Sequence, residues 1–188
     1  MGGSLTLITG GARSGKSTYA IAMGEQSEGR VVYIATAQAG DADMAQRIER
    51  HRSERPAEWM TIEEPRHIST AIRGASPHDA LVIVDCLTMW VANLLLDHFH
   101  DVDAPLQDEL ERADHDIRHE IADLCALPAE LTLDLLVVTN EVGSGVVPPY
   151  AAGRAYRDLL GTANQLVARA ADRVVLLVAG LPLEIKAP

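Results

Sequence analysis

One short segment near the start of the chain limits the fold more than any other. The apolar or β-favouring run Leu5–Thr9 leads directly into Gly10-Gly11-Ala12-Arg13-Ser14-Gly15-Lys16-Ser17, and the helix-forming residues Thr18–Met23 follow at once. This order of strand, Gly-x-x-x-x-Gly-Lys-Ser loop and helix is typical of a P-loop. The segment therefore predicts a site for a nucleoside triphosphate between a buried strand and a helix.

Each residue type in this loop suits a bound phosphate. The loop glycines allow backbone angles at which successive N–H groups turn inward around an anion. The helix that follows adds its unpaired N–H groups and the positive end of its dipole. We expect Lys16 to act catalytically by placing a mobile positive charge on the β- and γ-phosphates, and the Ser17 hydroxyl to ligate Mg²⁺.

The composition restricts the other partners. With 188 residues, 47% of them hydrophobic and 23% charged, the chain fits one globular domain of residues 1–188. A formal net charge of −11 argues against nucleic acid or an anionic membrane as the main partner. Cys86 and Cys125 lie far apart without metal-ligand spacing, which indicates buried thiols. Since no signal segment and no run of membrane-spanning length occurs, we expect a cytoplasmic protein without membrane insertion.

Apolar runs alternate with helical patterns along the chain. The runs are nearly continuous in Val, Ile and Leu, as in strands covered on both faces, and comprise Leu5–Thr9, Val31–Ala35, Ala80–Val84, Leu135–Thr139 and Val174–Ala179. The intervening patterns predict helices over Gly15–Gln26, Asp41–Arg55, Thr88–Phe99, Leu106–Ala126 and Arg154–Ala171. This alternation predicts an α/β fold with a doubly wound, mainly parallel sheet, to which Leu183–Lys186 adds an antiparallel edge strand.

The segment Leu81-Val82-Ile83-Val84-Asp85 has the form of a Walker B strand, an apolar run that ends in a carboxylate. In P-loop proteins this carboxylate lies beside the phosphate loop and holds Mg²⁺ directly or through water. Many strands end in Asp for reasons of turn formation alone. The P-loop upstream nevertheless favours a metal-binding role for Asp85, together with Ser17.

A histidine lies within a basic helix pattern. Arg47, His51 and Arg55 are spaced i, i+4 and i+8, so they share one helix face, while Met44 and Ile48 can anchor a neighbouring face to the core. Flanking guanidinium groups favour a neutral, nucleophilic imidazole and can hold phosphates, so His51 could attack an α-phosphate. The spacing alone favours a simpler interpretation, a solvated basic helix face.

Two further features are open to more than one interpretation. The loop Asn140–Pro148 pairs polar residues at a strand end with two glycines, which suits either phosphate sensing or an ordinary glycine-rich turn. His98, His100, His115 and His119 lie among Asp and Glu residues. Their helix has the charge pattern of a solvated face, which we favour over a metal site.

Together these motifs resemble one family, the bifunctional adenosylcobinamide kinase/adenosylcobinamide-phosphate guanylyltransferases of cobalamin biosynthesis. The resemblance spans nearly the whole chain. The matching residues are Gly10–Ser17, Tyr33–Gln38, Arg47-Ile48 with His51, Arg55-Pro56, Trp59, Glu63, Asp85–Thr88, Thr139–Gly143, Arg157-Asp158, Gly161 and Asn164-Gln165.

The resemblance implies a RecA-like fold, a homotrimer and two reactions. The enzyme would phosphorylate the aminopropanol hydroxyl of adenosylcobinamide with ATP or GTP. It would then transfer GMP from GTP to that phosphate through a guanylylated histidine, releasing pyrophosphate. His51 matches that histidine, which reverses the interpretation from spacing alone. The nucleotide contacts carried over are Gly10, Gly11, Ala12, Arg13, Ser14, Gly15, Lys16, Ser17, Thr36, Ala37, Gln38, Arg52, Ser53, Glu54, Arg55, Glu63 and Asp85.

Two other functions stay open from the sequence. In a simple small-molecule kinase, His51 would be structural. In a P-loop GTPase or ATPase switch, hydrolysis would change the affinity for a partner, but the chain has no Asn-Lys-x-Asp motif to read guanine. A covalent protein–GMP adduct would distinguish the bifunctional enzyme from the simple kinase.

Overall fold

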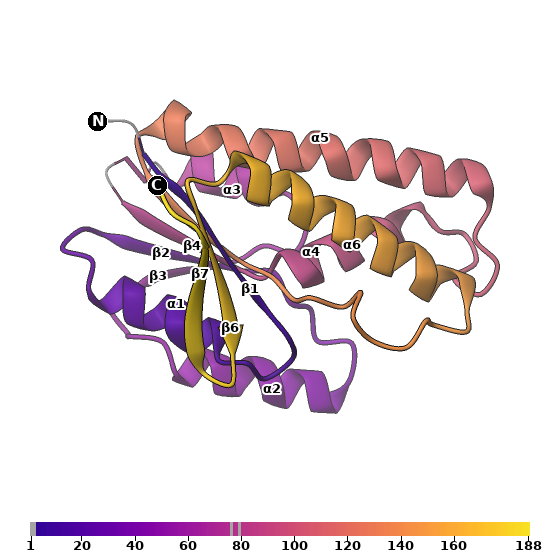
Figure 1. Cartoon of the computed structure of the whole chain (residues 1–188), viewed down its shortest axis with the longest axis horizontal. Helices are drawn as coiled ribbons and strands as arrows, with labels where there is room; N and C mark the ends of the chain where they lie inside the picture. Colours follow the sequence, from indigo (N-terminus) through magenta and orange to yellow (C-terminus); the bar gives the residue numbers. More distant parts are fainter. Residues whose placement is uncertain (1–2, 76, 79) are drawn as a thin grey trace.

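The computed structural model describes residues 3–75, 77–78 and 80–188, which form a seven-stranded sheet with helices on both faces (Figure 1). The spatial order of the strands is β3-β2-β4-β5-β1-β6-β7. Their bounds are β1 (Leu5–Gly10), β2 (Val31–Ala35), β3 (Met60–Glu63), β4 (Leu81–Asp85), β5 (Asp134–Val138), β6 (Arg173–Val178) and β7 (Leu181–Lys186). All neighbours are parallel except β7, which pairs antiparallel with β6. The predicted α/β class and antiparallel edge strand are confirmed.

The helices divide between the two faces of the sheet. Four of them, α3 (Ile68–Gly74), α4 (Leu87–His98), α5 (Gln107–Leu131) and α6 (Ala151–Ala170), pack on one another over one face. The helix α1 (Lys16–Glu25) covers the other face, and α2 (Ala42–Ser53) lies on that same side (Figure 1). Within the described residues, no helix is long and apolar enough to cross a membrane.

The core consists of two apolar clusters, one on each face of the sheet. Side chains alternate along each strand, so Val82 and Val84 pack under α3 to α6 while Ile83 packs under α1. Because both faces are covered, the central strands are buried at almost every position. This burial explains the continuous apolar runs in the sequence.

Two elements, β3 and α3, are absent from the sequence-based prediction. β3 has only four residues at the sheet edge, three of them exposed, so it lacks the apolar run that marks a strand. α3 has seven residues, too few for a clear helical period.

Some predicted helix ends were also wrong. α2 ends at Ser53 rather than Arg55. α5 continues past Ala126 to Leu131 and includes Pro128, because Leu127 and Pro128 are buried against the core and tertiary packing outweighs the missing backbone donor.

Candidate nucleotide-binding site

The phosphate loop joins β1 to α1 and depends on two glycines. Gly10 has φ 151°, and a Cβ there would lie 2.5 Å from the Leu177 carbonyl oxygen. Gly15, the residue before α1, has φ 96°, and a Cβ there would lie 3.2 Å from Cα of Gly180 in the β6–β7 turn. The Gly180 N–H donates to the Ser14 carbonyl at 2.9 Å. The hairpin at the sheet edge therefore supports the loop from outside.

Lys16 turns back into the loop. Its Nζ donates to the Gly11 carbonyl oxygen at 2.6 Å and lies 3.4 Å from the Ser14 hydroxyl. Burial lowers the pKa of the Lys16 ammonium, and the nearby groups Cys86 and Asp85 oppose that shift. The positive charge of Lys16 is therefore only partly compensated by nearby groups, which favours binding of an anion in the loop.

Asp85 ends β4 beside the loop. Tyr33 on β2 donates its hydroxyl to Asp85 Oδ2 at 2.6 Å. Burial, reinforced by that carboxylate, raises the pKa of Tyr33 well above its usual range, so the phenol stays a donor. One carboxylate oxygen is thereby held in place, and the Asp85 side chain contributes to the pocket wall.

Arg55 stacks on the ring of the same tyrosine. Its guanidinium carbon lies 4.0 Å from the Tyr33 ring centroid, and Trp59 stacks on that ring with a centroid distance of 6.4 Å. The Arg55 Nε is buried and has no hydrogen-bond partner within the described part of the chain. Because a buried donor without an acceptor is costly, it suits an incoming anion or carbonyl oxygen.

The helix α2 forms the wall opposite the loop. Asp41 caps it by accepting from the Met44 N–H at 2.7 Å. No residue of α2 is buried, so Met44 and Ile48 do not anchor it to the core as predicted. They line the pocket instead, because the apolar side of this helix faces a cavity.

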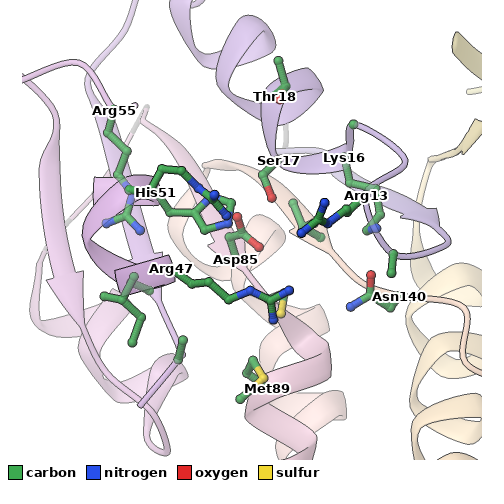
Figure 2. Close-up of a pocket in the computed structure, with 18 of the residues that line it drawn as sticks. Arg13, Lys16, Ser17, Thr18, Arg47, His51, Arg55, Asp85, Met89 and Asn140 are labelled. Atoms are coloured by element: carbon green, nitrogen blue, oxygen red, sulfur yellow. The ribbon is translucent and has the colours of Figure 1, made fainter. Parts of the chain in front are cut away.

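His51 lies on this wall, with Nδ1 3.4 Å from Glu54 Oε2. Arg47 and His51 share the pocket-facing side of α2 (Figure 2). Arg55 lies beyond the helix end, so the prediction that all three share a helix face is wrong. All three nevertheless line the same cavity, since the chain after α2 turns back over Tyr33.

The cavity has a volume of about 440 Å³ and brings together most of the predicted site. Among the predicted residues, its lining contains Ala12, Arg13, Ser14, Gly15, Lys16, Ser17, Ala37, His51, Arg55, Glu63 and Asp85. The lining does not include Gly10, Gly11, Thr36, Gln38, Arg52, Ser53 or Glu54. Thr36 is fully buried and exchanges hydrogen bonds with the Cys86 backbone at 2.7 Å, which braces the ends of β2 and β4.

Sequence reasoning missed several lining residues, among them Arg50, Met89 and Val138. Met89 lies on α4 below the pocket in Figure 2 and carries no signal that separates it from a core residue. Asn140 belongs to the polar strand end noted above. Its N–H donates to the Thr88 hydroxyl at 2.8 Å, and Asn164 donates to its carbonyl at 3.1 Å. This network fixes Asn140 at the cavity.

The histidine-rich region contributes nothing to this site. His98 pairs with Asp116 at 3.4 Å, while His115 and His119 are exposed on α5. Throughout residues 3–75, 77–78 and 80–188, no three His, Cys, Asp or Glu side chains gather as metal ligands.

Comparison with known proteins gives relatives over nearly the full chain. A family model described as cobinamide kinase/cobinamide phosphate guanyltransferase matches residues 6–185. The chain is 41% identical over 183 residues to the bifunctional adenosylcobalamin biosynthesis protein CobU of Escherichia coli, covering 97% of this chain and 99% of that one. It is 42% identical to CobP of Pseudomonas aeruginosa, described in the same words, over 96% of both chains.

Solved structures agree on the fold at low sequence identity. A RadB recombinase has a TM-score of 0.50 and 17% identity, covering 93% of this chain and 74% of that one. An ATPase of a type III secretion system has a TM-score of 0.60 and 12% identity, covering 97% of this chain and 57% of that one. These likenesses support the RecA-like arrangement of the sheet.

Proposed function

The chain belongs to the cobinamide kinase/cobinamide phosphate guanyltransferase family, and we propose that it performs both reactions in the pocket described above. It is a bifunctional enzyme of adenosylcobalamin biosynthesis that phosphorylates cobinamide and transfers a guanylyl group to the phosphate. One observation carries the proposal: Lys16 and His51 line the same cavity of about 440 Å³. That volume is in the range of a site for one small ligand, so one triphosphate binds at a time.

In the kinase step, the aminopropanol hydroxyl of cobinamide attacks the γ-phosphorus, and the bond to the β-phosphate oxygen breaks. The nucleoside diphosphate leaves, and the hydroxyl proton is released to solvent. The loop N–H groups and Lys16 stabilise the charge that develops on the phosphate oxygens. Asn140, held at the edge of the cavity, is suited to orient the attacking hydroxyl.

In the guanylyl-transfer step, His51 Nε2 attacks the α-phosphorus of GTP, and pyrophosphate leaves as the phosphorus–oxygen bond breaks. An oxygen of cobinamide phosphate then attacks the same phosphorus and releases the imidazole. The Glu54 carboxylate, 3.4 Å from Nδ1, favours the tautomer with its proton on Nδ1 and leaves Nε2 free to attack. Arg47 and Arg55 are placed to absorb charge on the phosphates.

The donor set of this pocket fits Mg²⁺. The Ser17 hydroxyl and the Asp85 carboxylate both line the cavity and offer the oxygen ligands that a hard cation prefers. When bound, Mg²⁺ neutralises charge on the triphosphate. Tyr33, by holding Asp85 Oδ2, orients the carboxylate for this role.

Further details of the proposal rest on the family resemblance stated above. Residues 1–188 act as one catalytic domain, the corrinoid is adenosylcobinamide, and ATP or GTP serves the kinase step. The protein is a cytoplasmic homotrimer. Light scattering measures the mass of the assembly in solution. A homotrimer should have three times the 20.2 kDa of one chain.

The shared pocket is tested by competition. Incubation with GTP labelled at the α-phosphate, without corrinoid, should leave labelled GMP on the protein, and acid should release it while base does not. An ATP analogue with a nitrogen bridge between its β- and γ-phosphates should lower the yield of this adduct competitively. An adduct yield that is insensitive to saturating analogue would refute the single pocket.

A further inference from the structure

A second cavity, apolar and about 360 Å³ in volume, lies between the end of α4, the start of α6 and the loop after β5. Figure 1 shows that loop, in orange, passing from the sheet to α6. The groove is lined mainly by aromatic and aliphatic side chains, among them Leu95, Leu96, Phe99, Val142, Tyr150 and Tyr156. We call it the α4–α6 groove.

The α4–α6 groove continues from the nucleotide pocket along two elements. On α4, Met89 lines the pocket, whereas Ala92 and Leu96 line the groove, and this spacing of i, i+3 and i+7 keeps the three residues on one helix face. After β5, Asn140 lines the pocket and Val142 the groove. From Met89 to Ala92 the helix rises only about 4.5 Å.

The groove walls are held by hydrogen bonds. Arg154 donates to the carbonyl oxygens of Pro148 and Pro149, at 3.1 and 2.7 Å, and so fixes the loop against the start of α6. The Tyr156 hydroxyl donates to the Thr88 carbonyl at 3.3 Å and ties α6 to α4. The groove therefore exists before any ligand arrives, which lowers the cost of binding.

Apolar side chains in and beside the groove remain open to solvent. Leu96 is 50% exposed and Tyr150 62%, and Val147 in the adjoining loop is 58% exposed. A contiguous apolar surface next to an active site is typical of a ligand-binding groove.

We propose that the α4–α6 groove binds the corrin macrocycle of cobinamide, with its aminopropanol arm directed past Met89 and Asn140 into the nucleotide pocket. This inference rests on the proposed function, because it assumes that the acceptor hydroxyl reacts in that pocket. The macrocycle is a broad ring whose face and methyl groups are apolar and whose edge bears amide arms. Aliphatic and aromatic walls suit the face of the ring. Arg157 at the groove pairs with Asp158 through Nε and Nη2, and its Nη1 group can donate to an amide oxygen.

The aminopropanol arm is long enough to pass from the groove into the nucleotide pocket. An amide-linked arm about as long as two extended residues reaches about 7 Å. That reach exceeds the rise of about 4.5 Å between Ala92 and Met89. The kinase and transferase steps then use the same bound ring, since the arm alone moves between the γ-phosphate and the guanylyl group.

The test replaces each of two exposed aliphatic residues with aspartate. Leu96→Asp introduces a carboxylate into the groove, and Ile185→Asp makes the same kind of change at a 60% exposed position on β7, away from both cavities. Three quantities are measured for each: cobinamide binding by equilibrium dialysis, GTP affinity, and the yield of protein–GMP adduct without corrinoid.

We expect Leu96→Asp to weaken cobinamide binding at least tenfold and to leave GTP affinity and corrinoid-free adduct formation unchanged. Ile185→Asp should match the wild type in all three measurements. Unchanged cobinamide binding in Leu96→Asp would overturn the inference. A changed oligomeric mass of Leu96→Asp, with cobinamide binding intact, would also overturn the inference. It would show that the groove is a contact between copies of the chain. Absence of the adduct in the wild type would contradict the proposed function alone, because dialysis measures corrinoid binding directly.

Discussion

The hydrogen bond from Tyr33 to Asp85 gives a prediction whose size follows from the structure. The Tyr33 side chain is 1% exposed and its hydroxyl lies 2.6 Å from Asp85 Oδ2. Hydrogen bonds to charged groups contribute about 1.5–3 kcal/mol. Because Asp85 lines a cavity that water can enter, its freed oxygen can be solvated in Tyr33→Phe. We therefore expect Tyr33→Phe to lower the free energy of unfolding by about 1.5 kcal/mol, the lower limit of that range.

Urea unfolding measures this loss. With a slope of about 2 kcal/mol/M, the midpoint should fall by roughly 0.75 M while the slope stays constant. Phenylalanine keeps the ring that contacts Arg55 and Trp59, so the change isolates the hydroxyl. In the Asp85→Asn background the same substitution should cost clearly less, since the charged acceptor is gone. An equal cost in both backgrounds, or none in either, would show that the hydrogen bond from Tyr33 to the charged Asp85 does not stabilise the fold.

Three other perturbations test the phosphate loop, the packing of α1 and the two thiols. Lys16→Ala should reduce both reactions at least 100-fold, because the charge on the phosphates is lost, with turnover of each step as the measurement. Gly24→Ala should destabilise by about 1–2 kcal/mol in urea, because a Cβ there would lie 2.4 Å from Trp59 Cη2 and overpacking outweighs the gain in helix propensity. Burial raises the pKa of Cys86 to about 12 and of Cys125 to about 11, above the ordinary value of 9.0. As pH rises, the thiols ionise in the unfolded state before they ionise in the folded state. The contribution of the two thiols to the free energy of unfolding should therefore be complete below pH 9 and fall toward pH 12, as unfolding measurements can show. The native protein should also resist alkylation by iodoacetamide at pH 8.

The sequence predicted the features of the fold that depend on residues close together in the chain. The phosphate loop needs particular residues at adjacent positions, so Gly10–Ser17 could be identified directly. The central strands are buried on both faces and therefore leave unbroken apolar runs. The short edge strand β3 has no such burial, and its sequence carries no comparable signal.

The site was harder to predict because tertiary contacts build much of it. The apolar residues Met44 and Ile48 were expected to anchor α2 to the core, but a helical period cannot distinguish a core from a cavity wall. Arg55 reaches the pocket through its stacking on Tyr33, which is distant in sequence. Met89 likewise enters the pocket only because β4 and α4 bring it beneath the loop.

We propose that His51 carries GMP in the same pocket that binds triphosphate through Lys16. The most direct measurement is the intact mass of wild type and His51→Ala after incubation with GTP and Mg²⁺, combined with an assay of cobinamide phosphorylation. We expect one added GMP on the wild type, none on His51→Ala, and retention of phosphorylation by that variant, because transfer of the γ-phosphoryl group needs no covalent carrier. An undiminished GMP adduct on His51→Ala, or no adduct on the wild type, would contradict it.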